Sequence, residues 1–152
     1  MINIDREYLG LMMEAGYILL GMQRFKEAKE VFEGVSVIVP ESDIPVVALG
    51  SVEFCQGRFA AAMKRYEDAL KLNPSSTYAK AYMGEALFFD GKKDEALSVL
   101  EEVARTDHNG TAGNFAKALL DAIKKGFDPN MLSGHEEIRK YEEKKRKIRA
   151  RG

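Results

Sequence analysis

Hydrophobic and polar residues alternate with a helical period in the middle of the chain, between residues 42 and 75. Two amphipathic segments there are separated by the turn-forming residues 56–58, and the second segment ends at Asn73-Pro74. Apolar residues that recur every three or four positions predict amphipathic helices, and Gly and Pro mark where such helices end. The stretch therefore predicts two helices joined by a tight turn.

The same pattern returns at a spacing of 34 residues on either side of this stretch. Small, bulky and Pro positions recur in register, as Gly16, Gly50 and Gly84; Ala28, Ala62 and Ala96; Phe32, Tyr66 and Leu100; and Pro40 and Pro74. Series that share one period over three copies exceed what composition alone produces, so the chain contains an internal repeat. The copies span about residues 9–42, 43–76 and 77–110.

The repeat register predicts six helices, at about residues 5–20, 24–34, 44–56, 59–72, 78–90 and 93–105. The β-branched run at 35–39 favours a strand by local propensity, but the register places it at the end of the second helix and in a packed connector. A stripe of apolar residues predicts a seventh helix at about 113–125, with Gly126 as its stop. Residues Ser133 to Glu136 form a capping-box pattern ahead of a final charged helix.

The period, and the order of small, bulky and Pro positions within it, resemble the tetratricopeptide repeat, in which Leu-Gly, Ala, an aromatic residue and Pro recur. At these positions the middle copy carries Leu49-Gly50, Ala62, Tyr66 and Pro74. The resemblance implies an all-α fold: a right-handed superhelix of three helix-turn-helix repeats with a C-terminal capping helix and a charged tail helix. It predicts a repeat domain over residues 1–126 and a turn with a basic tail helix over 127–152.

In tetratricopeptide proteins the first helix of each repeat lines a concave groove that usually binds a peptide or a helix. The resemblance places these residues in the groove: Met13, Tyr17, Leu20, Ile44, Val47, Ser51, Phe54, Tyr78, Ala81, Tyr82, Glu85 and Phe88. The positions are apolar and aromatic with few charges, which favours the hydrophobic side of a helix or an extended apolar segment as the ligand. On this interpretation Phe54→Glu and Phe88→Glu abolish partner binding while helicity stays near wild type.

The same positions argue against one subfamily. Co-chaperones that hold the acidic C-terminus of heat-shock proteins clamp its carboxylate with Lys, Asn and Arg side chains. The corresponding residues here offer none of those donors; they are Met13, Tyr17, Ala48, Tyr78 and Tyr82. A carboxylate buried among them would be left unpaired at a high cost in free energy, so no carboxylate clamp is expected.

An open apolar groove is an aggregation liability, so it is expected to be covered. One occupant is a helix of a partner; the others are the chain itself, including its final helix, and a second copy in a homodimer. Three repeats, a capping helix and an apolar groove resemble the tetratricopeptide chaperones of bacterial type III secretion, which hold an aggregation-prone export substrate until delivery.

Two branches of those chaperones differ before the first repeat. Chaperones of the translocators usually carry a helical extension there, and the repeats of this chain begin near Leu9. The resemblance is therefore closer to the branch that holds the C-terminal helix of the needle subunit. In that branch a small helical co-chaperone often packs on the first repeat, where Tyr8, Leu11 and Met12 would contact it.

The main alternative is a general tetratricopeptide scaffold that assembles a protein complex. A further hypothesis concerns the tail, because residues Arg139 to Arg151 hold eight Lys or Arg and two Glu in a chain whose net charge is −1. Such a segment contacts nucleic acid or anionic lipid in some proteins. Glu residues four positions before Lys or Arg neutralise much of that charge, which favours a solvated helix over either contact. Ile138, Tyr141 and Ile148 give the helix only a thin apolar stripe.

The residues predict no enzyme, cofactor, small-molecule substrate or metal site. The chain has two histidines, His108 and His135, and one cysteine, Cys55, whereas a zinc site needs three or four ligands. The lone cysteine fits a reducing compartment, and the first residues lack the basic and apolar regions of a signal peptide. These features predict a cytoplasmic protein.

Overall fold

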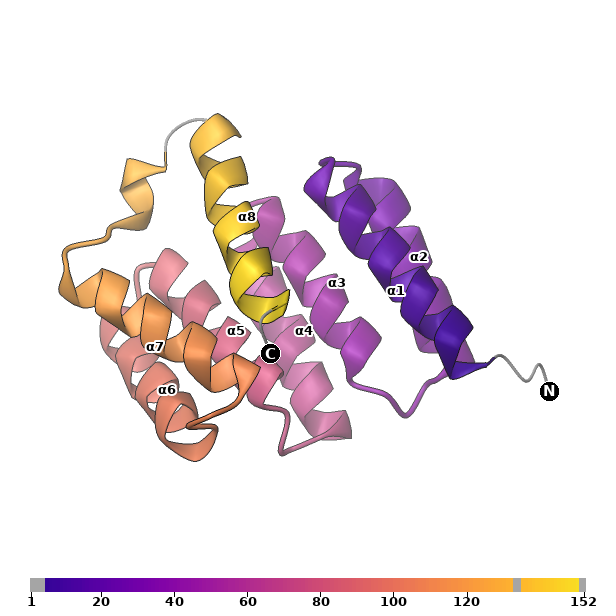
Figure 1. Ribbon diagram of the computed structural model, residues 1–152, viewed down its shortest axis with the longest axis horizontal. Coiled ribbons are helices and arrows are strands. Elements are labelled where there is room, and N and C mark those ends of the chain that lie inside the picture. Colours follow the sequence, from indigo (N-terminus) through magenta and orange to yellow (C-terminus); the bar gives the residue numbers. More distant parts are fainter. Residues whose placement is uncertain (1–4, 133–134, 151–152) are drawn as a thin grey trace. The chain divides into compact units, whose positions relative to one another are not determined.

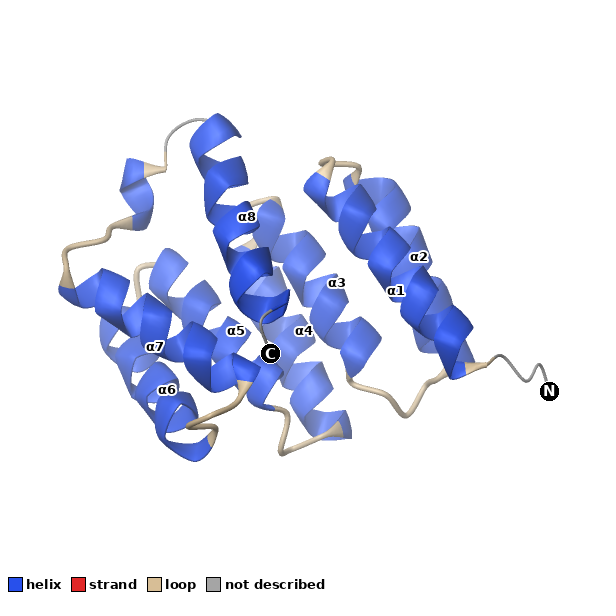
Figure 2. Ribbon diagram, viewed as in Figure 1, coloured by secondary structure: helices blue, strands red, loops and turns tan. Residues whose placement is uncertain are grey.

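The computed structural model describes residues 5–132 and 135–150, and every regular element in that part of the chain is a helix (Figures 1 and 2). The α-helices are α1 (Arg6–Gly21), α2 (Phe25–Ile38), α3 (Ile44–Cys55), α4 (Phe59–Leu72), α5 (Thr77–Phe89), α6 (Lys93–Thr106), α7 (Thr111–Lys124) and α8 (His135–Ala150). A short 3-10 helix, Pro129–Met131, precedes α8. The helices group into two compact units, residues 1–76 and 77–152.

The first unit contains two helical hairpins, α1–α2 and α3–α4, at the positions that the repeat register predicts. Asp5 caps α1, since its side chain accepts a hydrogen bond from the backbone N–H of Glu7. Helix α2 continues through Ile38, four residues beyond its predicted end, so the β-branched run is helical as far as Ile38 and forms no strand. Packing within the repeat therefore overrides the local strand propensity of that run.

Each repeat hairpin closes where a glycine of its first helix meets a bulky side chain of its second. The pairs are Gly16 with Phe32, Gly50 with Tyr66 and Gly84 with Leu100. A Cβ atom at Gly16 or Gly50 would lie 2.3 Å from the facing ring, and one at Gly84 would lie 2.8 Å from the leucine. The two series that define the repeat in sequence are thus the two sides of one close helix crossing.

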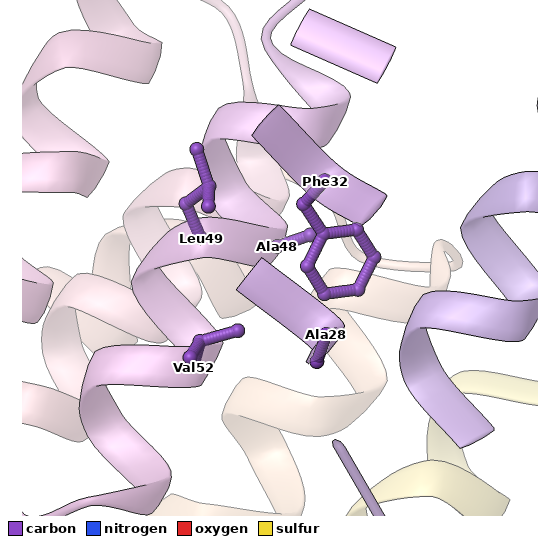
Figure 3. Close-up of a cluster of buried hydrophobic side chains, with 5 residues drawn as sticks. All are labelled: Ala28, Phe32, Ala48, Leu49 and Val52. Carbon is purple, nitrogen blue, oxygen red and sulfur yellow. The ribbon is translucent and has the colours of Figure 1, made fainter. Parts of the chain in front are cut away.

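The buried centre of the first unit joins its two hairpins. Side chains of α2 and α3 form one cluster there, consisting of Ala28, Phe32, Ala48, Leu49 and Val52 (Figure 3). Tyr17 of α1 packs its ring edge against Phe32 at a centroid distance of 5.1 Å. Neighbouring hairpins therefore cover each other's apolar faces, as stacked helical repeats require.

In the second unit α7 packs against both helices of the α5–α6 hairpin, and α8 packs against α7. Helix α7 begins two residues earlier than predicted, and its Gly113 N–H donates to the Asp107 carboxylate at 2.8 Å. Gly126, with φ of 94°, follows its end in the left-handed conformation that favours glycine. Ser133 and Gly134 of the predicted capping box lie outside the described residues, and the proposed domain boundary at residue 126 stays a prediction.

Candidate helix-binding site

The predicted groove residues are mostly buried. On α1 the side chains of Met13, Tyr17 and Leu20 are half-buried against the cluster of the first unit. On α3 only Ile44 is exposed, while Val47, Ser51 and Phe54 are buried. On α5 Tyr78 is half-buried, and the buried residues are Ala81, Tyr82, Glu85 and Phe88. Both rings belong to packed interiors, in which a carboxylate is costly to bury, so the structure leads us to expect that Phe54→Glu and Phe88→Glu destabilise the helices.

Glu85 is the one acidic residue among these positions, and the structure buries it completely. Its two carboxylate oxygens are both engaged by α8. Lys145 donates from Nζ to Oε1 at 2.7 Å, and the Tyr141 hydroxyl donates to Oε2. Lys145 is itself only 4% exposed and also pairs with Glu142 at 3.9 Å. The result is a buried ion pair between two residues that are 60 positions apart in sequence.

Electrostatics explains why the three side chains occur together. Burial raises the pKa of the Glu85 carboxyl above its ordinary value, and the ammonium of Lys145 opposes that rise. A buried carboxylate without a partner is costly, whereas one that is paired and hydrogen-bonded at both oxygens is tolerated. Glu85 can therefore stay charged and buried only while α8 covers it.

An aromatic layer surrounds this ion pair. Tyr141 stacks on Phe127 with an interplanar angle of 3° and lies 5.3 Å from Phe89 between ring centroids. The ammonium of Lys145 lies 4.8 Å from the ring centroid of Tyr82, within range of a cation–π interaction. Burial, followed by the charge of Glu85, raises the pKa of Tyr141 well above 10. The hydroxyl consequently stays protonated, which lets it donate to the carboxylate.

These contacts correct the interpretation of the tail as a solvated helix. Several of its charged side chains are exposed, but Lys145 is buried and Tyr141 is half-buried on the second unit. In the structure the final helix, α8, covers part of the predicted groove on α5. This was one of the alternatives that the sequence left open. The sequence carried a signal for it, because Tyr141 and Lys145 are four residues apart and so share a helix face. The 34-residue repeat pattern could not indicate that Tyr141 and Lys145 contact Glu85.

The residues predicted to contact a co-chaperone lie along α1. Tyr8 and Leu11 are exposed, and Met12 is half-buried. Ile18 of α1 and Met22, the residue directly after the helix, are also exposed. We call Tyr8, Leu11, Ile18 and Met22 the apolar stripe of α1. Large exposed apolar patches are characteristic of interaction sites.

Within residues 5–132 and 135–150, no three His, Cys, Asp or Glu side chains are grouped so that they could hold a metal ion. No helix among the described residues has the length and apolar character needed to cross a membrane.

Comparison with known proteins confirms the resemblance predicted from the repeat. Residues 54–120 match the tetratricopeptide repeat family. Superkiller protein 3 of Saccharomyces cerevisiae is 28% identical over 118 residues, which cover 74% of this chain. The chain spans about 8% of the length of that relative.

Solved structures show the same fold. The type III secretion translocator chaperone SycD of Yersinia enterocolitica matches with a TM-score of 0.68 at 17% identity, over 78% of this chain and 92% of its own. PcrH in complex with the chaperone binding region of PopB matches with a TM-score of 0.65 at 14% identity, over 80% of this chain and 98% of its own. The predicted all-α tetratricopeptide fold is therefore confirmed.

Proposed function

We propose that the chain is a protein-binding chaperone that holds an apolar helical segment of a partner against the first-helix faces of its repeats. The observation that carries the proposal is the seating of α8 on α5 through Tyr141 and Lys145, because it shows that such a face accepts a helix. PcrH, which shares the fold, was solved with a binding region of PopB. Recognition of a helix in a groove is a common use of such surfaces.

The finer assignment is an export substrate of a type III secretion system, specifically the needle subunit, held in the cytoplasm before delivery. The structural similarity to SycD, a secretion chaperone, supports this class of substrate. In such a complex the half-buried Tyr78 at the start of α5 contacts the substrate.

The apolar stripe of α1 supports a second partner, a small helical co-chaperone. Leu11 and Ile18 are more than half exposed, so they bury apolar surface only when another helix covers them. At roughly 25 cal/mol per Å² of apolar area, covering such side chains gives a useful driving force for association. Tyr8, Leu11 and Met12 are the residues that we assign to this contact.

The experiment is site-directed crosslinking in the full chain. A photoreactive benzoylphenylalanine replaces Tyr78 on α5 or, as a control, the exposed Glu101 on α6. After irradiation in source cells, the expected result is a crosslink from position 78, but not from 101, to the C-terminal helix of a small secreted subunit. Crosslinks only to a second copy, or equal crosslinking from both positions, would contradict the proposal.

A general scaffold is the alternative function, because the match of residues 54–120 to the tetratricopeptide repeat family is equally compatible with it. A scaffold assembles folded proteins rather than protecting one helix. Crosslinks from position 78 into the interior of a large folded complex would support the scaffold over the chaperone. Native mass spectrometry of the same material distinguishes the two by the mass and stoichiometry of the companion.

A further inference from the structure

Glu85 is not required by the repeat. The residues at the equivalent position of the first two repeats, one and two periods earlier, are Ser51 and Tyr17, and neither carries a charge. Each nevertheless packs in a helical hairpin of the same design, with Ser51 buried and Tyr17 against Phe32. The carboxylate at position 85 is therefore not needed for packing within the α5–α6 hairpin. It interacts instead with the helix that covers α5.

Helix α8 covers α5, and most of the surface of α8 is polar. Helix α8 contains seven Lys or Arg and four Glu among its sixteen residues. It approaches α5 with two side chains one helical turn apart, Tyr141 and Lys145. Both reach Glu85, and Tyr141 also rests on Phe89 and Phe127. The ion pair with Lys145 compensates the burial of the carboxylate, so removing one partner should weaken the attachment of α8.

We propose that the surface of α5 around Glu85 is a binding site for a helix that carries an aromatic residue followed four positions later by a lysine, with α8 as its internal ligand. A partner helix with the same pattern displaces α8 and takes its contacts. Glu85 then selects the partner, because an apolar helix without the cation would leave the carboxylate buried and unpaired. The displacement step rests on the proposed function, since it supposes that a partner helix uses this face.

The test uses the full chain and a labelled synthetic peptide with the sequence of residues 135–152. In the wild-type chain the attached α8 competes with the peptide, so binding is weak. In Lys145→Met the attached helix loses its ion pair, and the peptide should bind at least tenfold more tightly. The matched control is Lys144→Met, because Lys144 is exposed on the same helix and its change should leave peptide binding at the wild-type level.

Two further variants show whether Glu85 is the determinant. A peptide in which the residue corresponding to Lys145 is methionine should not bind the Lys145→Met chain. Glu85→Gln in the Lys145→Met chain should also remove tight binding of the unmodified peptide. Equal peptide binding by Lys145→Met and Lys144→Met, or unchanged binding after Glu85→Gln, would overturn the inference.

Hydrogen exchange measured peptide by peptide separates undocking from unfolding. Lys145→Met should raise exchange in residues 135–150 while α5 and α6 stay protected, and Lys144→Met should not. Replacing both charges, in Glu85→Met with Lys145→Met, should restore the protection of α8, because no unpaired charge remains. If α8 is as protected in Lys145→Met as in the wild type, its docking does not depend on the pair and the inference fails.

The two proposals fail separately. If the peptide binds as expected but position 78 crosslinks to no secreted subunit, the Glu85 site stands and the chaperone assignment falls. If a secreted subunit binds with an affinity that Glu85→Gln leaves unchanged, the chaperone assignment stands and the selection by Glu85 falls.

Discussion

Helices α1 and α5 are both the first helix of a repeat, yet equivalent residues are exposed on α1 and buried on α5. Leu11 and Ile18 of α1 are 56% and 58% exposed. The equivalent residues two periods later, Ala79 and Ala86 of α5, are completely buried. The equivalents of Leu11 and Ile18 one period later, Pro45 and Val52 of α3, are also buried, and Val52 belongs to the cluster that α3 forms with α2. One repeat pattern therefore produces the same helix but does not decide which of its faces is covered.

The groove faces differ as well. Tyr17 of α1 is half-buried by its own hairpin, through its contact with Phe32. Glu85 of α5 is covered by α8, and its carboxylate contacts the ammonium of Lys145 and the hydroxyl of Tyr141. The first repeat thus keeps Leu11 and Ile18 at the surface, whereas the third repeat carries a buried carboxylate that α8 pairs.

The largest effect that tests this comparison comes from one charge placed on each helix. Phe88→Glu should lower the free energy of unfolding by about 3–5 kcal/mol, since the ring is 6% exposed and packs on Phe127. Leu11→Glu should change it by no more than about 0.5 kcal/mol, because that side chain is on the surface. Urea denaturation followed by circular dichroism measures both. Similar losses for the two variants would show that the α1 stripe is not a free surface.

Methyl groups at the helix crossings should have intermediate effects. Gly16→Ala places Cβ 2.3 Å from the rigid Phe32 ring and should cost about 1–3 kcal/mol of stability. Gly84→Ala faces the side chain of Leu100, which can rotate, so it should cost less. Gly10→Ala is the control, because nothing lies within 4 Å of its Cβ position and alanine should stabilise the helix by about 0.5–1 kcal/mol. Thermal unfolding ranks the three; equal losses at positions 16 and 84 would contradict the expected order.

Alkaline pH should weaken the cover of α5. Tyr141 has a pKa raised well above 10 in the folded chain by burial and by Glu85, with Glu142 and Tyr82 contributing. Below pH 10 the phenol is protonated whether α8 is docked or not. Above pH 10 the undocked form ionises first, so the docked state loses stability as pH rises toward the folded-state pKa. The ammonium of Lys145 contacts the same carboxylate.

Absorbance at 295 nm measures this titration as the difference between the wild type and Tyr141→Phe. The midpoint of the difference curve should lie above 10 in buffer and return to about 10 in concentrated urea. Far-UV circular dichroism over the same range shows whether the helices persist. A midpoint near 10 in buffer would mean that Tyr141 is not held against Glu85.

The smallest effect concerns the turns inside the hairpins. Gln23, with φ of 61°, occupies the left-handed position that Gly91 fills, with φ of 83°, between α5 and α6. Gln23→Gly should therefore raise the stability by up to about 1 kcal/mol, and Gly91→Gln should lower it by a similar amount. Differential scanning calorimetry of the pair checks the sign. A loss of stability in Gln23→Gly would mean that side-chain contacts of Gln23 outweigh its backbone conformation.

Much of the fold was predictable because the contacts that define it are local. Gly50 and Tyr66 lie in adjacent helices of one hairpin, so their spacing recurs in every copy and appears as a period. The helix across the β-branched run was predictable for the same reason. The α7 start was missed by two residues, since the Asp107 side chain that receives the Gly113 N–H lies six residues before it.

The candidate site was predictable only in part. The resemblance selected Glu85 and Tyr82 as groove positions and left open whether a partner, a second copy or the final helix of the chain covers them. Burial of Phe54 and Phe88 was not visible in the sequence, because a residue's position on a helix face does not show what packs against that face.

The sequence by itself determined the helices, their pairing into hairpins and the one acidic residue at a groove position. Only the tertiary structure decided that this acid is covered, and by which residues. Lys145 lies 60 residues from Glu85 and outside the repeats, so no periodicity connects them. Their pairing is decided by electrostatics in the folded chain, where a buried carboxylate is stable only beside a cation.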